Sequence, residues 1–500
     1  MRYLMSIDQG TSSSRCILYD LEGRPAAVAQ QEFGQIFPQS GWVEHDPEAI
    51  WQSQSSVCRE AMQRLQLRPE DIAGIGIANQ RETTVIWDRQ TGKPIYNAIV
   101  WQDRRTAEQC TRLQTAGWED KVRAKTGLLL DPYFSATKIR WILDHVDGAL
   151  EQARQGRLAF GTVDTWLVWK MTQGQLHITD VSNASRTLLF NIETLRWDEE
   201  LLELFGIPTA LLPEVRASSE CYGLTRSDEI GAGIPIGAVV GDQQASLFGQ
   251  LCVEPGMAKC TYGTGSFLVM NTGAEKVLSK HRLLTTVAWQ IGARVDYALE
   301  GSVFVGGAAI QWLRDALHLL GSAADSETLA SSVGDNGGVY FVPAFTGLGA
   351  PDWDPDARGA IFGLTRGTSA AHIARAALES MAFQVDDILR ILSEDSGTPV
   401  SQLRIDGGAA ANQFLAQFQS DISGLEVIRP AHLETTALGA AYLAGIAMEV
   451  WTLDQLADKW RADRSFKGLM PGGVQEAHKK QWRKAVERTR GWAGQEAVER

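Results

Sequence analysis

Paired cysteines are absent from this sequence. The 500 residues contain six cysteines and no C-x-x-C pair, and several of the six lie in apolar runs. They are Cys16, Cys58, Cys110, Cys221, Cys252 and Cys260. Disulfide frameworks and thiolate metal sites need paired or closely spaced cysteines, so we expect buried free thiols. Such thiols are typical of a reducing compartment and predict a cytoplasmic protein.

An excess of positive charge and a membrane-spanning run are also missing. The chain has 47 Lys and Arg against 60 Asp and Glu, a formal net charge of −13. That balance disfavours nucleic acid or an anionic membrane as the main partner. No apolar signal segment precedes Asp8. The long apolar stretch at residues 436–453 is rich in Ala and Gly and contains Glu449, so we expect a packed interior helix there and no stable membrane insertion.

Several common catalytic motifs do not occur. The sequence has no G-x-x-x-x-G-K-[ST] loop, no strand-linked G-x-G-x-x-G, no H-E-x-x-H and no G-x-S-x-G. Their absence excludes a P-loop enzyme and argues against the dinucleotide, zinc peptidase and serine hydrolase sites that these motifs build. The eight histidines do not cluster at metal-ligand spacing. What remains is a set of Gly/hydroxyl turns and single carboxylates at strand ends.

The first polar turn lies near the N-terminus. An apolar run over residues 3–7 reaches Asp8, one Gly and four hydroxyl residues fill residues 10–14, and residues 16–19 are apolar again. This pattern predicts a β-hairpin whose turn directs backbone N–H groups and hydroxyls toward a phosphate. Asp8 suits Mg²⁺, and Arg15 adds positive charge. An ordinary hairpin with a polar turn and a surface arginine is the open alternative.

The same design recurs about half the chain later. Residues 258–270 read as a strand, a Gly-Thr-Gly-Ser turn and a returning strand. A third Gly-rich turn, residues 407–412, follows another strand-like run. The repetition predicts an α/β protein with two related halves, residues 1–250 and 251–500, and a cleft between them. The two hairpins would then hold the phosphates of one nucleotide from opposite walls.

Other elements follow from periodicity and flanking residues. Asp46, Pro47 and Glu48 give a strong helix start, and apolar residues at helical spacing continue to Leu65. The remaining expected strands are residues 26–33, 72–78, 83–87, 236–240, 285–290, 295–300 and 403–406. The remaining expected helices are residues 302–320, 369–393 and 412–422, with a solvated outer helix at 476–492.

Asp242 is the best candidate for a general base. It follows an apolar run in a Gly-Asp-Gln-Gln turn, where burial makes an unused carboxylate costly. A helix N-cap is its alternative role. Adjacent Arg81 and Glu82 suit a clamp for two polyol hydroxyls, although a surface ion pair would give the same pattern. Trp101 and Tyr133 suit an apolar wall, with core packing as the alternative.

These features fit phosphoryl transfer, which needs a cradle for the γ-phosphoryl group, Mg²⁺ and a base for the acceptor hydroxyl. The segments that carry them resemble the FGGY family of carbohydrate kinases. The resembling segments include DQGTSSSR at Asp8, NQRETT at Asn79, DPYFSATKIRWILDH at Asp131, GDQQASLFGQLC at Gly241, YGTGSF at Tyr262 and DGGAAAN at Asp406. They occur in the family's order nearly from end to end.

The resemblance implies a duplicated RNase-H-like fold of the actin, hexokinase and Hsp70 type, with two domains around a central cleft. The N-terminal domain would hold the polyol and the phosphates, and the C-terminal domain would hold the nucleotide. The implied reaction is ATP-dependent phosphorylation of glycerol to sn-glycerol 3-phosphate, the entry step of glycerol catabolism, with ATP and Mg²⁺. Another small polyol or sugar is the alternative substrate. The expected partners are these small molecules and further copies of the chain, in a dimer or a tetramer.

The resemblance also implies roles for single residues. The polyol contacts would be Arg81, Glu82, Trp101, Tyr133, Asp242, Gln243 and Phe267. The nucleotide contacts would be Thr11, Ser12, Ser13, Arg15, Thr264, Gly265, Gly307, Gln311, Gly408 and Asn412. Asp242 would be the base, and Asp8 would face Mg²⁺ through water. Residues 226–233 lack the Gly-rich, Arg-containing loop by which some bacterial relatives bind fructose 1,6-bisphosphate, so that inhibition is not expected.

Overall fold

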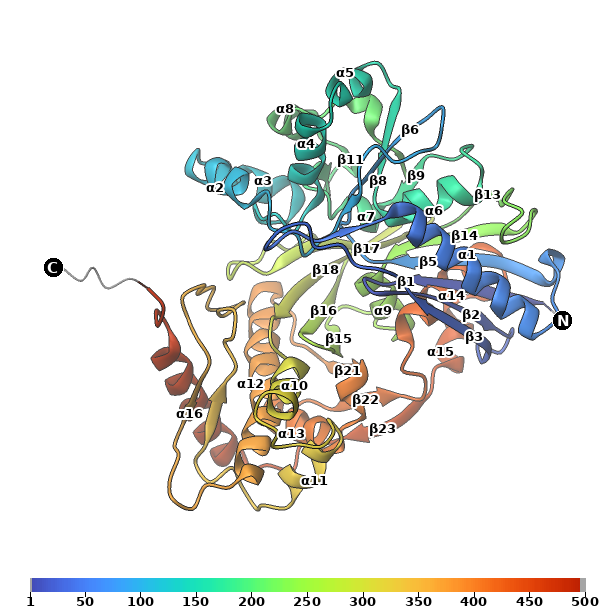
Figure 1. Cartoon of the computed structure of the whole chain (residues 1–500). Coiled ribbons are helices and arrows are strands. Elements are labelled where there is room, and N and C mark those ends of the chain that lie inside the picture. Colours follow the sequence, from blue (N-terminus) through green and yellow to red (C-terminus); the bar gives the residue numbers. More distant parts are fainter. Residues whose placement is uncertain (1, 495–500) are drawn as a thin grey trace.

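One 13-stranded sheet runs through both halves of the molecule (Figure 1). The computed structural model describes residues 2–494. The strand order is β23-β22-β21-β15-β16-β18-β17-β13-β14-β5-β1-β2-β3. The halves meet where β13 (Ser219–Leu224) pairs with β17 (Leu284–Ile291). A single sheet therefore connects the N-terminal and C-terminal halves.

The N-terminal half begins with an antiparallel meander. Its strands are β1 (Tyr3–Gln9), β2 (Ser13–Tyr19) and β3 (Pro25–Glu32). On the other side of β1, β5 (Ile72–Asn79) runs parallel to it, and β14 (Pro235–Gly241) runs parallel to β5. The register places Asp8 opposite Arg15 on β2 and beside Ala78 on β5.

The C-terminal half repeats this arrangement. The antiparallel strands are β15 (Met257–Tyr262), β16 (Ser266–Gly273) and β18 (Arg294–Val303). The parallel strands are β21 (Gln402–Asp406) and β22 (Val427–Pro430), followed by the edge strand β23 (Ala462–Phe466). The order 3-2-1-5-14 in the first half thus matches 18-16-15-21-22 in the second. The predicted duplicated α/β fold is confirmed.

Small residues let one helix of the C-terminal half pack under the N-terminal strands. Helix α14 (Thr435–Ala447) contacts β1, β5 and β14 and packs against α9 (Asp242–Gly249). A Cβ atom on Gly439 would lie 1.8 Å from the Ala245 carbonyl oxygen, so no larger residue fits there. The Ser6 hydroxyl donates to the Ala437 carbonyl across 2.6 Å. The apolar stretch is therefore an interior helix, as predicted.

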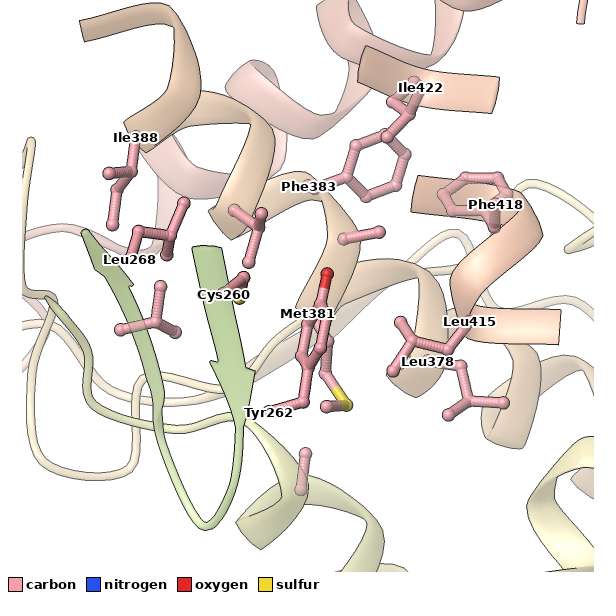
Figure 2. Packing of buried hydrophobic residues seen from close by; sticks show 14 of the residues in the cluster. Cys260, Tyr262, Leu268, Leu378, Met381, Phe383, Ile388, Leu415, Phe418 and Ile422 are labelled. Carbon is pink, nitrogen blue, oxygen red and sulfur yellow. The ribbon is translucent and has the colours of Figure 1, made fainter. Parts of the chain in front are cut away.

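The second half has its own core around the long helix α12 (Ala370–Ser396), shown in Figure 2. Aromatic side chains from α13 (Gln413–Ser423) and α16 (Gly472–Thr489) pack on it. The rings of Phe383 and Trp482 stack with centroids 5.2 Å apart, and Trp482 donates to Asp387 across 2.7 Å. Helix α16 is a largely exposed outer helix, as predicted, but it also buries Trp482, Ala485 and Val486 against this core.

A largely helical segment between β5 and β13 supplies part of the site. Its helices are α2 (Ala107–Thr115), α3 (Glu119–Thr126), α4 (Ser135–His145), α5 (Ala149–Arg154), α6 (Val163–Met171), α7 (Val181–Ala184) and α8 (Glu199–Phe205). Helices α2 to α5 and α8 form the upper end of the molecule in Figure 1, far from α12, α13 and α16. The loops at the base of this segment carry Tyr133 and Arg186 to the sheet.

Most of the other expected elements are present with shifted ends. Helix α1 (Pro47–Arg64) is capped by Asp46, which accepts from the Glu48 N–H. The helix expected from residue 302 begins later, as α10 (Gly307–Asp315), because β18 continues to Val303. All six cysteines are free, and only Cys221 is exposed. Within residues 2–494, no helix has the length and apolar character needed to cross a bilayer.

Candidate active site

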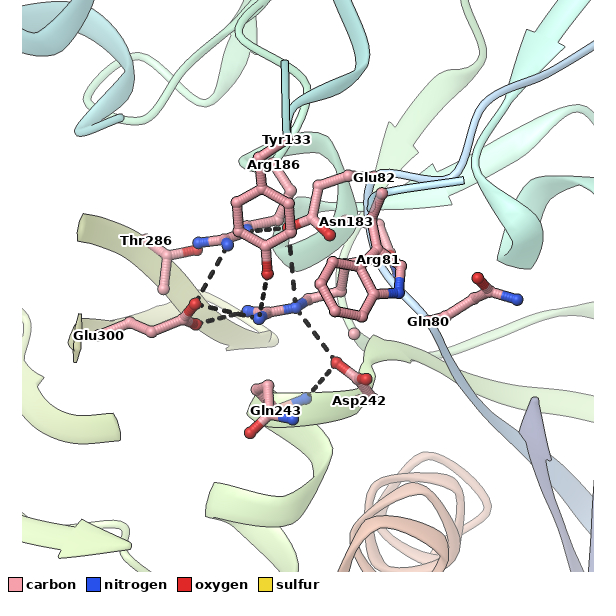
Figure 3. A network of polar contacts seen from close by, with 12 residues as sticks. Gln80, Arg81, Glu82, Tyr133, Asn183, Arg186, Asp242, Gln243, Thr286 and Glu300 are labelled. Carbon is pink, nitrogen blue, oxygen red and sulfur yellow. Dashed lines mark hydrogen bonds and ion pairs between the residues drawn. The ribbon is translucent and has the colours of Figure 1, made fainter. Parts of the chain in front are cut away.

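Two arginines and two glutamates form a buried network at the junction of the halves (Figure 3). Arg81 follows β5, and its guanidinium binds both carboxylate oxygens of Glu300 on β18, at 2.6 and 3.1 Å. Arg186 donates to Glu82 across 2.5 Å and to Glu300 across 3.1 Å. None of the four side chains is more than 2% exposed. The surface ion pair considered as an alternative for Arg81 and Glu82 is therefore wrong.

The two carboxylates of this network titrate differently because their partners differ. Burial opposes ionisation of Glu300, but Arg186 and Arg81 outweigh it and lower its pKa to about 2. Burial raises the pKa of Glu82 above its usual value. Arg186 and Arg81 offset only part of this effect, and Arg186 donates a single hydrogen bond to the Glu82 carboxylate. Glu82 also has φ of 60°, in the left-handed region that non-glycine residues rarely adopt. Such local strain occurs most often at functional sites.

Asp242 lies beside the network and remains accessible. Its side chain is 30% exposed, and its Oδ1 is 3.1 Å from the Arg81 Nε atom. Burial raises the pKa of Asp242, and Arg81 offsets part of that effect. Asp242 is the first residue of α9, while Gly241 holds the N-cap position without a side-chain cap. The N-cap alternative for Asp242 is thus excluded, and its carboxylate is available to a ligand.

Half-buried aromatic rings stand next to these charges. Trp101 and Tyr133 meet edge to face with centroids 5.6 Å apart, and neither is part of the fully buried core. The Tyr133 hydroxyl is 3.5 Å from Arg81 Nη2. Phe267, also half-buried, lies opposite Thr261 in the β15–β16 pair. The structure therefore brings together a buried charge cluster, one accessible carboxylate and an aromatic wall.

The first hairpin carries a carboxylate without a donor. The turn closes with a bond from the Gly10 N–H to the Ser13 carbonyl, 2.9 Å, and Trp101 donates to the Thr11 hydroxyl across 2.9 Å. Among residues 2–494, no hydrogen-bond donor contacts the Asp8 carboxylate, and Arg15 Nη1 is 4.0 Å away. Burial raises the pKa of Asp8 to about 6, although Arg15 lowers it in part.

An oxygen-seeking cation fits this position of Asp8. Mg²⁺ binds through one or two carboxylates, waters and substrate phosphates rather than in an all-protein cage. The described residues contain no cluster of three or more His, Cys, Asp or Glu side chains able to hold a metal. Asp8, which has only the long ion pair with Arg15 and lies beside a Gly/hydroxyl turn, is the kind of single carboxylate ligand that Mg²⁺ with a nucleotide requires.

The second hairpin is built from backbone. Gly263 N–H donates to the Gly265 carbonyl across 2.8 Å, and the N–H groups of Gly306 and Gly307 donate to the carbonyls of Thr264 and Gly263, both across 2.9 Å. A Cβ atom on Gly265 would lie 2.5 Å from the Val303 carbonyl oxygen. The turn is thus braced by the start of α10, and Thr264 at its tip stays exposed.

The other expected nucleotide residues lie around this second hairpin. Gln311 is exposed on α10. Gly408 is exposed, with open space where a Cβ would be, and follows Gly407, whose Cβ would lie 2.5 Å from the Tyr262 carbonyl oxygen. Asn412 caps α13 by accepting from the Leu415 N–H across 3.0 Å. Ser12, Ser13 and Arg15 belong to the first hairpin, so both hairpins contribute.

Sequence reasoning missed the partners contributed from a distance. Glu300, Arg186 and the buried Lys259 were not expected in the site. Each is a charged residue inside an apolar segment, which is a usable signal because a buried charge needs a partner. A crevice of about 860 Å³ lies elsewhere, between the β2–β3 turn and the α14–α15 (Leu453–Lys459) region, and none of the site residues lines it.

Fold and site together define a kinase-type enzyme with a duplicated sheet, in which two Gly/hydroxyl turns, one from each half, accompany an accessible carboxylate. The chain belongs to the FGGY family of carbohydrate kinases. The family's N-terminal domain model matches residues 3–249, and its C-terminal domain model matches residues 258–448.

Its relatives are similar over nearly their whole lengths. Glycerol kinase of Koribacter versatilis (strain Ellin345) is 59% identical over 491 residues, covering 98% of this chain and 99% of that one. Glycerol kinase of Paraburkholderia phytofirmans is 58% identical over 493 residues, with the same coverage. The crystal structure of Plasmodium falciparum glycerol kinase with ADP superposes with a TM-score of 0.93 at 38% identity, covering 98% of both chains. Xylulose kinase from Lactobacillus acidophilus, at 21% identity and a TM-score of 0.87, shares the fold.

Proposed function

We propose that this chain transfers the γ-phosphoryl group of ATP to glycerol and forms sn-glycerol 3-phosphate, the entry step of glycerol catabolism. Several relatives named as glycerol kinases are 57–59% identical over 98% of the chain. The observation that carries the proposal within the molecule is the placement of Arg81, Glu82 and Asp242 around one point, with only Asp242 accessible.

Glycerol recognition depends on pairing every hydroxyl. Arg81 and Glu82 supply a fixed donor and acceptor, and Gln243 supplies an amide next to the base. The rings of Trp101 and Tyr133, with Phe267, cover the carbon chain. A site that leaves a buried Arg or Glu unpaired is penalised, so a molecule lacking one hydroxyl binds poorly.

Asp242 acts as the general base. As the primary hydroxyl oxygen of glycerol attacks the γ-phosphorus, its proton passes to the Asp242 carboxylate, and the bond from phosphorus to the β-phosphate oxygen breaks to release ADP. The raised pKa of Asp242 brings its basicity closer to the working pH than that of an exposed aspartate. Exclusion of water from the closed site prevents hydrolysis.

The two hairpins hold the nucleotide phosphates. We assign Thr11, Ser12, Ser13 and Arg15 to one side and Thr264 and Gly265 to the other, with the adenosine end at Gly307, Gln311, Gly408 and Asn412. Asp8 would hold Mg²⁺, and when bound this ion would neutralise phosphate charge. The free cysteines support a reducing compartment. A cytoplasmic location and a homo-oligomeric state stay predictions.

A different small polyol or sugar is the second candidate substrate. The fold is shared with xylulose kinases, so the fold does not separate the two. The large aromatic side chains of Trp101 and Tyr133, which pack edge to face beside the charge network, favour a small substrate such as glycerol. Purified protein with ATP and Mg²⁺ is expected to prefer glycerol by orders of magnitude over xylulose, gluconate and erythritol. Comparable turnover of a pentulose or hexulose would contradict the assignment.

The Asp242→Asn variant tests the base directly. Transfer to glycerol is expected to fall by about 10⁴-fold, the upper range for losing a positioned base, while ADP affinity changes less than about twofold. Asp147→Asn, at an exposed aspartate of the helical segment between β5 and β13, serves as the control and is expected to keep wild-type activity. Retention of transfer by Asp242→Asn would show that another group takes the proton.

A further inference from the structure

A fully buried lysine of the C-terminal half faces the polyol residues. Lys259 lies on β15 and has no exposed surface. Lys259 is the cross-strand partner of Val269 on β16, and Val269 is the cross-strand partner of Glu300 on β18. The three side chains therefore project from the same face of the sheet. Phe267 leaves that face as well, two residues along β16. Lys259 is therefore on the face of the sheet that carries the polyol site.

The lysine bonds directly to a proposed polyol ligand. Its ammonium donates to the Gln243 side-chain oxygen and, across 2.8 Å, to the Thr261 hydroxyl. Thr261 in turn donates to Asp406 across 2.5 Å. Gln243 lies next to Asp242 and donates its backbone N–H to that carboxylate across 2.7 Å. A single lysine thus ties the residue next to the base to the strand that precedes the second hairpin.

Lys259 supplies one of the positive charges that offset the buried carboxylates around the site. Its ammonium is under the influence of Asp406, Asp242 and Glu300, while Arg81 and Arg186 pair with Glu82, Asp242 and Glu300. Without the lysine, Asp406 and Asp242 would lose a compensating cation. An uncompensated charge in a region of low dielectric is costly, and the accessible carboxylate would be the first to take up a proton.

We propose that Lys259 is a positioning residue of the transfer reaction, which fixes the Gln243 amide against the polyol and balances the charge of the Asp242 carboxylate. The inference rests on the proposed function. The groups that face Asp242 are Arg81 after β5, Lys259 on β15, Glu300 on β18 and Asp8 on β1. Of these, only Arg81 and Lys259 carry positive charge.

The electrostatics agree with this geometry. Burial raises the pKa of Asp242, and Arg81 and Lys259 both lower it. Burial lowers the pKa of Lys259, and the neighbouring Asp406, Asp242 and Glu300 oppose that effect. Removing the lysine charge leaves Asp242 with Arg81 alone, so the pKa of Asp242 rises further. A higher pH is then needed before the base is ionised.

Another buried lysine shows what a purely structural role looks like. Lys138 has no exposed surface either, but its ammonium bonds only to the backbone carbonyls of Tyr133 and Glu82. It fixes main chain and bonds to no side chain of the site. Lys259 bonds to two side chains, one of which is assigned to the substrate. The contrast assigns Lys259 to the chemistry of the site.

The test compares Lys259→Met, Lys259→Arg and Lys170→Met over a range of pH. For Lys259→Met we expect kcat to fall about 100-fold, as for loss of one electrostatic contributor. The acidic limb of its kcat/KM profile is expected to move up by about one pH unit, while ADP affinity stays within about twofold. Lys259→Arg keeps the charge, so its acidic limb stays within about 0.3 unit of wild type. Lys170, which pairs with Glu48 far from the site, is the control and keeps wild-type kinetics.

Chemical rescue provides the second measurement. Lys259→Ala leaves space for a small amine. Added ethylammonium is therefore expected to raise the activity of this variant by about tenfold, whereas tetramethylammonium, which has no N–H donor, is expected to leave it unchanged. The rescue decides the matter if Lys259→Met does not fold. An unmoved acidic limb in Lys259→Met, or no difference between the two amines, overturns the inference.

The outcomes separate this inference from the proposed function. If Asp242→Asn retains transfer, the base assignment fails whatever the lysine variants do. If Asp242→Asn is inactive and Lys259→Met shows wild-type kcat and pH profile, only the role of Lys259 fails.

Discussion

The hairpin between β1 and β2 and the hairpin between β15 and β16 occupy the same place in the two halves. Each joins the first two strands of a meander, and each first strand runs parallel to its other neighbour, β5 or β21. Counted from the turn glycines Gly10 and Gly263, Asp8 corresponds to Thr261. The carboxylate of the second half lies instead on the neighbouring strand, where Asp406 is beside Thr261.

The two carboxylates differ in how well they are satisfied. Asp406 accepts hydrogen bonds from Ser246, Gln250, Thr261 and Thr435. Asp8 accepts none from residues 2–494 and lies 4.0 Å from Arg15. A carboxylate with four donors is structural, whereas a buried carboxylate without donors can bind a cation. The two halves therefore share the Gly/hydroxyl turn, but the carboxylate near the first turn lacks the hydrogen-bond donors that surround Asp406.

Exchanging each carboxylate for its amide gives the largest expected contrast. Asp8→Asn is expected to lower kcat roughly 10³-fold, in line with several kcal/mol of metal assistance, and to leave the thermal midpoint nearly unchanged. Asp406→Asn is expected to destabilise the fold by about 2 kcal/mol because buried donors lose their acceptor, with an unchanged Mg²⁺ requirement. Thermal unfolding and Mg²⁺ titrations of kcat measure both. Equal kinetic losses in the two variants would erase the distinction.

Glu300, on β18 of the C-terminal half, pairs with Arg81 and Arg186 of the N-terminal half. Glu300→Gln removes the anion between Arg81 and Arg186, so the free energy of unfolding is expected to fall by about 3 kcal/mol at pH 7. The pKa of Glu300 is lowered to about 2 from 4.5, so the wild-type advantage is present above about pH 4.5 and disappears as pH falls through 2. Urea unfolding of both proteins at several pH values measures the difference. A difference that does not depend on pH would contradict the ionic origin.

The turn glycines allow the hairpins to be compared sterically. A Cβ on Gly10 would meet the Ser13 carbonyl at 3.3 Å, and a Cβ on its counterpart Gly263 would meet the Gly265 carbonyl at 3.5 Å. A Cβ on Gly265, which corresponds to Ser12 of the first turn, would meet the Val303 carbonyl at 2.5 Å. Gly265→Ala is therefore expected to weaken ATP binding by about 30-fold, and Gly10→Ala by about threefold, because overpacking costs of order 1–3 kcal/mol. Calorimetric titration with ADP checks both. The reverse order would mean that the first turn is the more tightly constrained.

Acid is expected to weaken binding of Mg²⁺ at Asp8. Burial raises the pKa of Asp8 to about 6, and metal binding needs the carboxylate. The Mg²⁺ concentration for half-maximal rate is expected to rise by about fivefold between pH 6 and pH 5, and by close to tenfold per unit at still lower pH. Asp8→Asn, assayed over the same range, corrects for protonation of ATP itself. Parallel curves for the two proteins would exclude Asp8 as the titrating ligand.

The smallest effect tests the contact between the aromatic wall and the first turn. Trp101→Phe keeps a ring but removes the hydrogen bond to Thr11, 2.9 Å long. Loss of one such bond costs about 1 kcal/mol, so the KM for ATP is expected to rise about fivefold. Steady-state kinetics with glycerol held saturating provide the measurement. A change in the KM for glycerol alone would place the indole N–H on the polyol instead.

The sequence predicted the elements whose information is local. The turns at Gly10 and Gly263 share a Gly/hydroxyl composition between apolar runs, which predicts a hairpin. Asp46 and Pro47 are adjacent in the sequence and together predict a helix start. The pairing of Arg81 with Glu300 joins residues 219 positions apart and depends on the register of β18. Trp482 on the tail helix likewise finds Phe383 only in the folded core. Contacts of this kind carry no local pattern, so sequence reasoning missed them.

The packing of helix α14 against β1 also affects folding during synthesis. The underside of β1 is covered by residues 435–447, and Trp451 donates to the Leu21 carbonyl across 2.9 Å. The first strand to leave the ribosome therefore waits for partners made more than 400 residues later, which takes roughly 20 to 90 s at ordinary elongation rates. During that interval the nascent N-terminal half exposes the apolar surface of Leu4, Val240 and Phe248, which α14 later buries. Productive folding of this chain should accordingly depend on chaperones that shield this surface until translation is nearly complete.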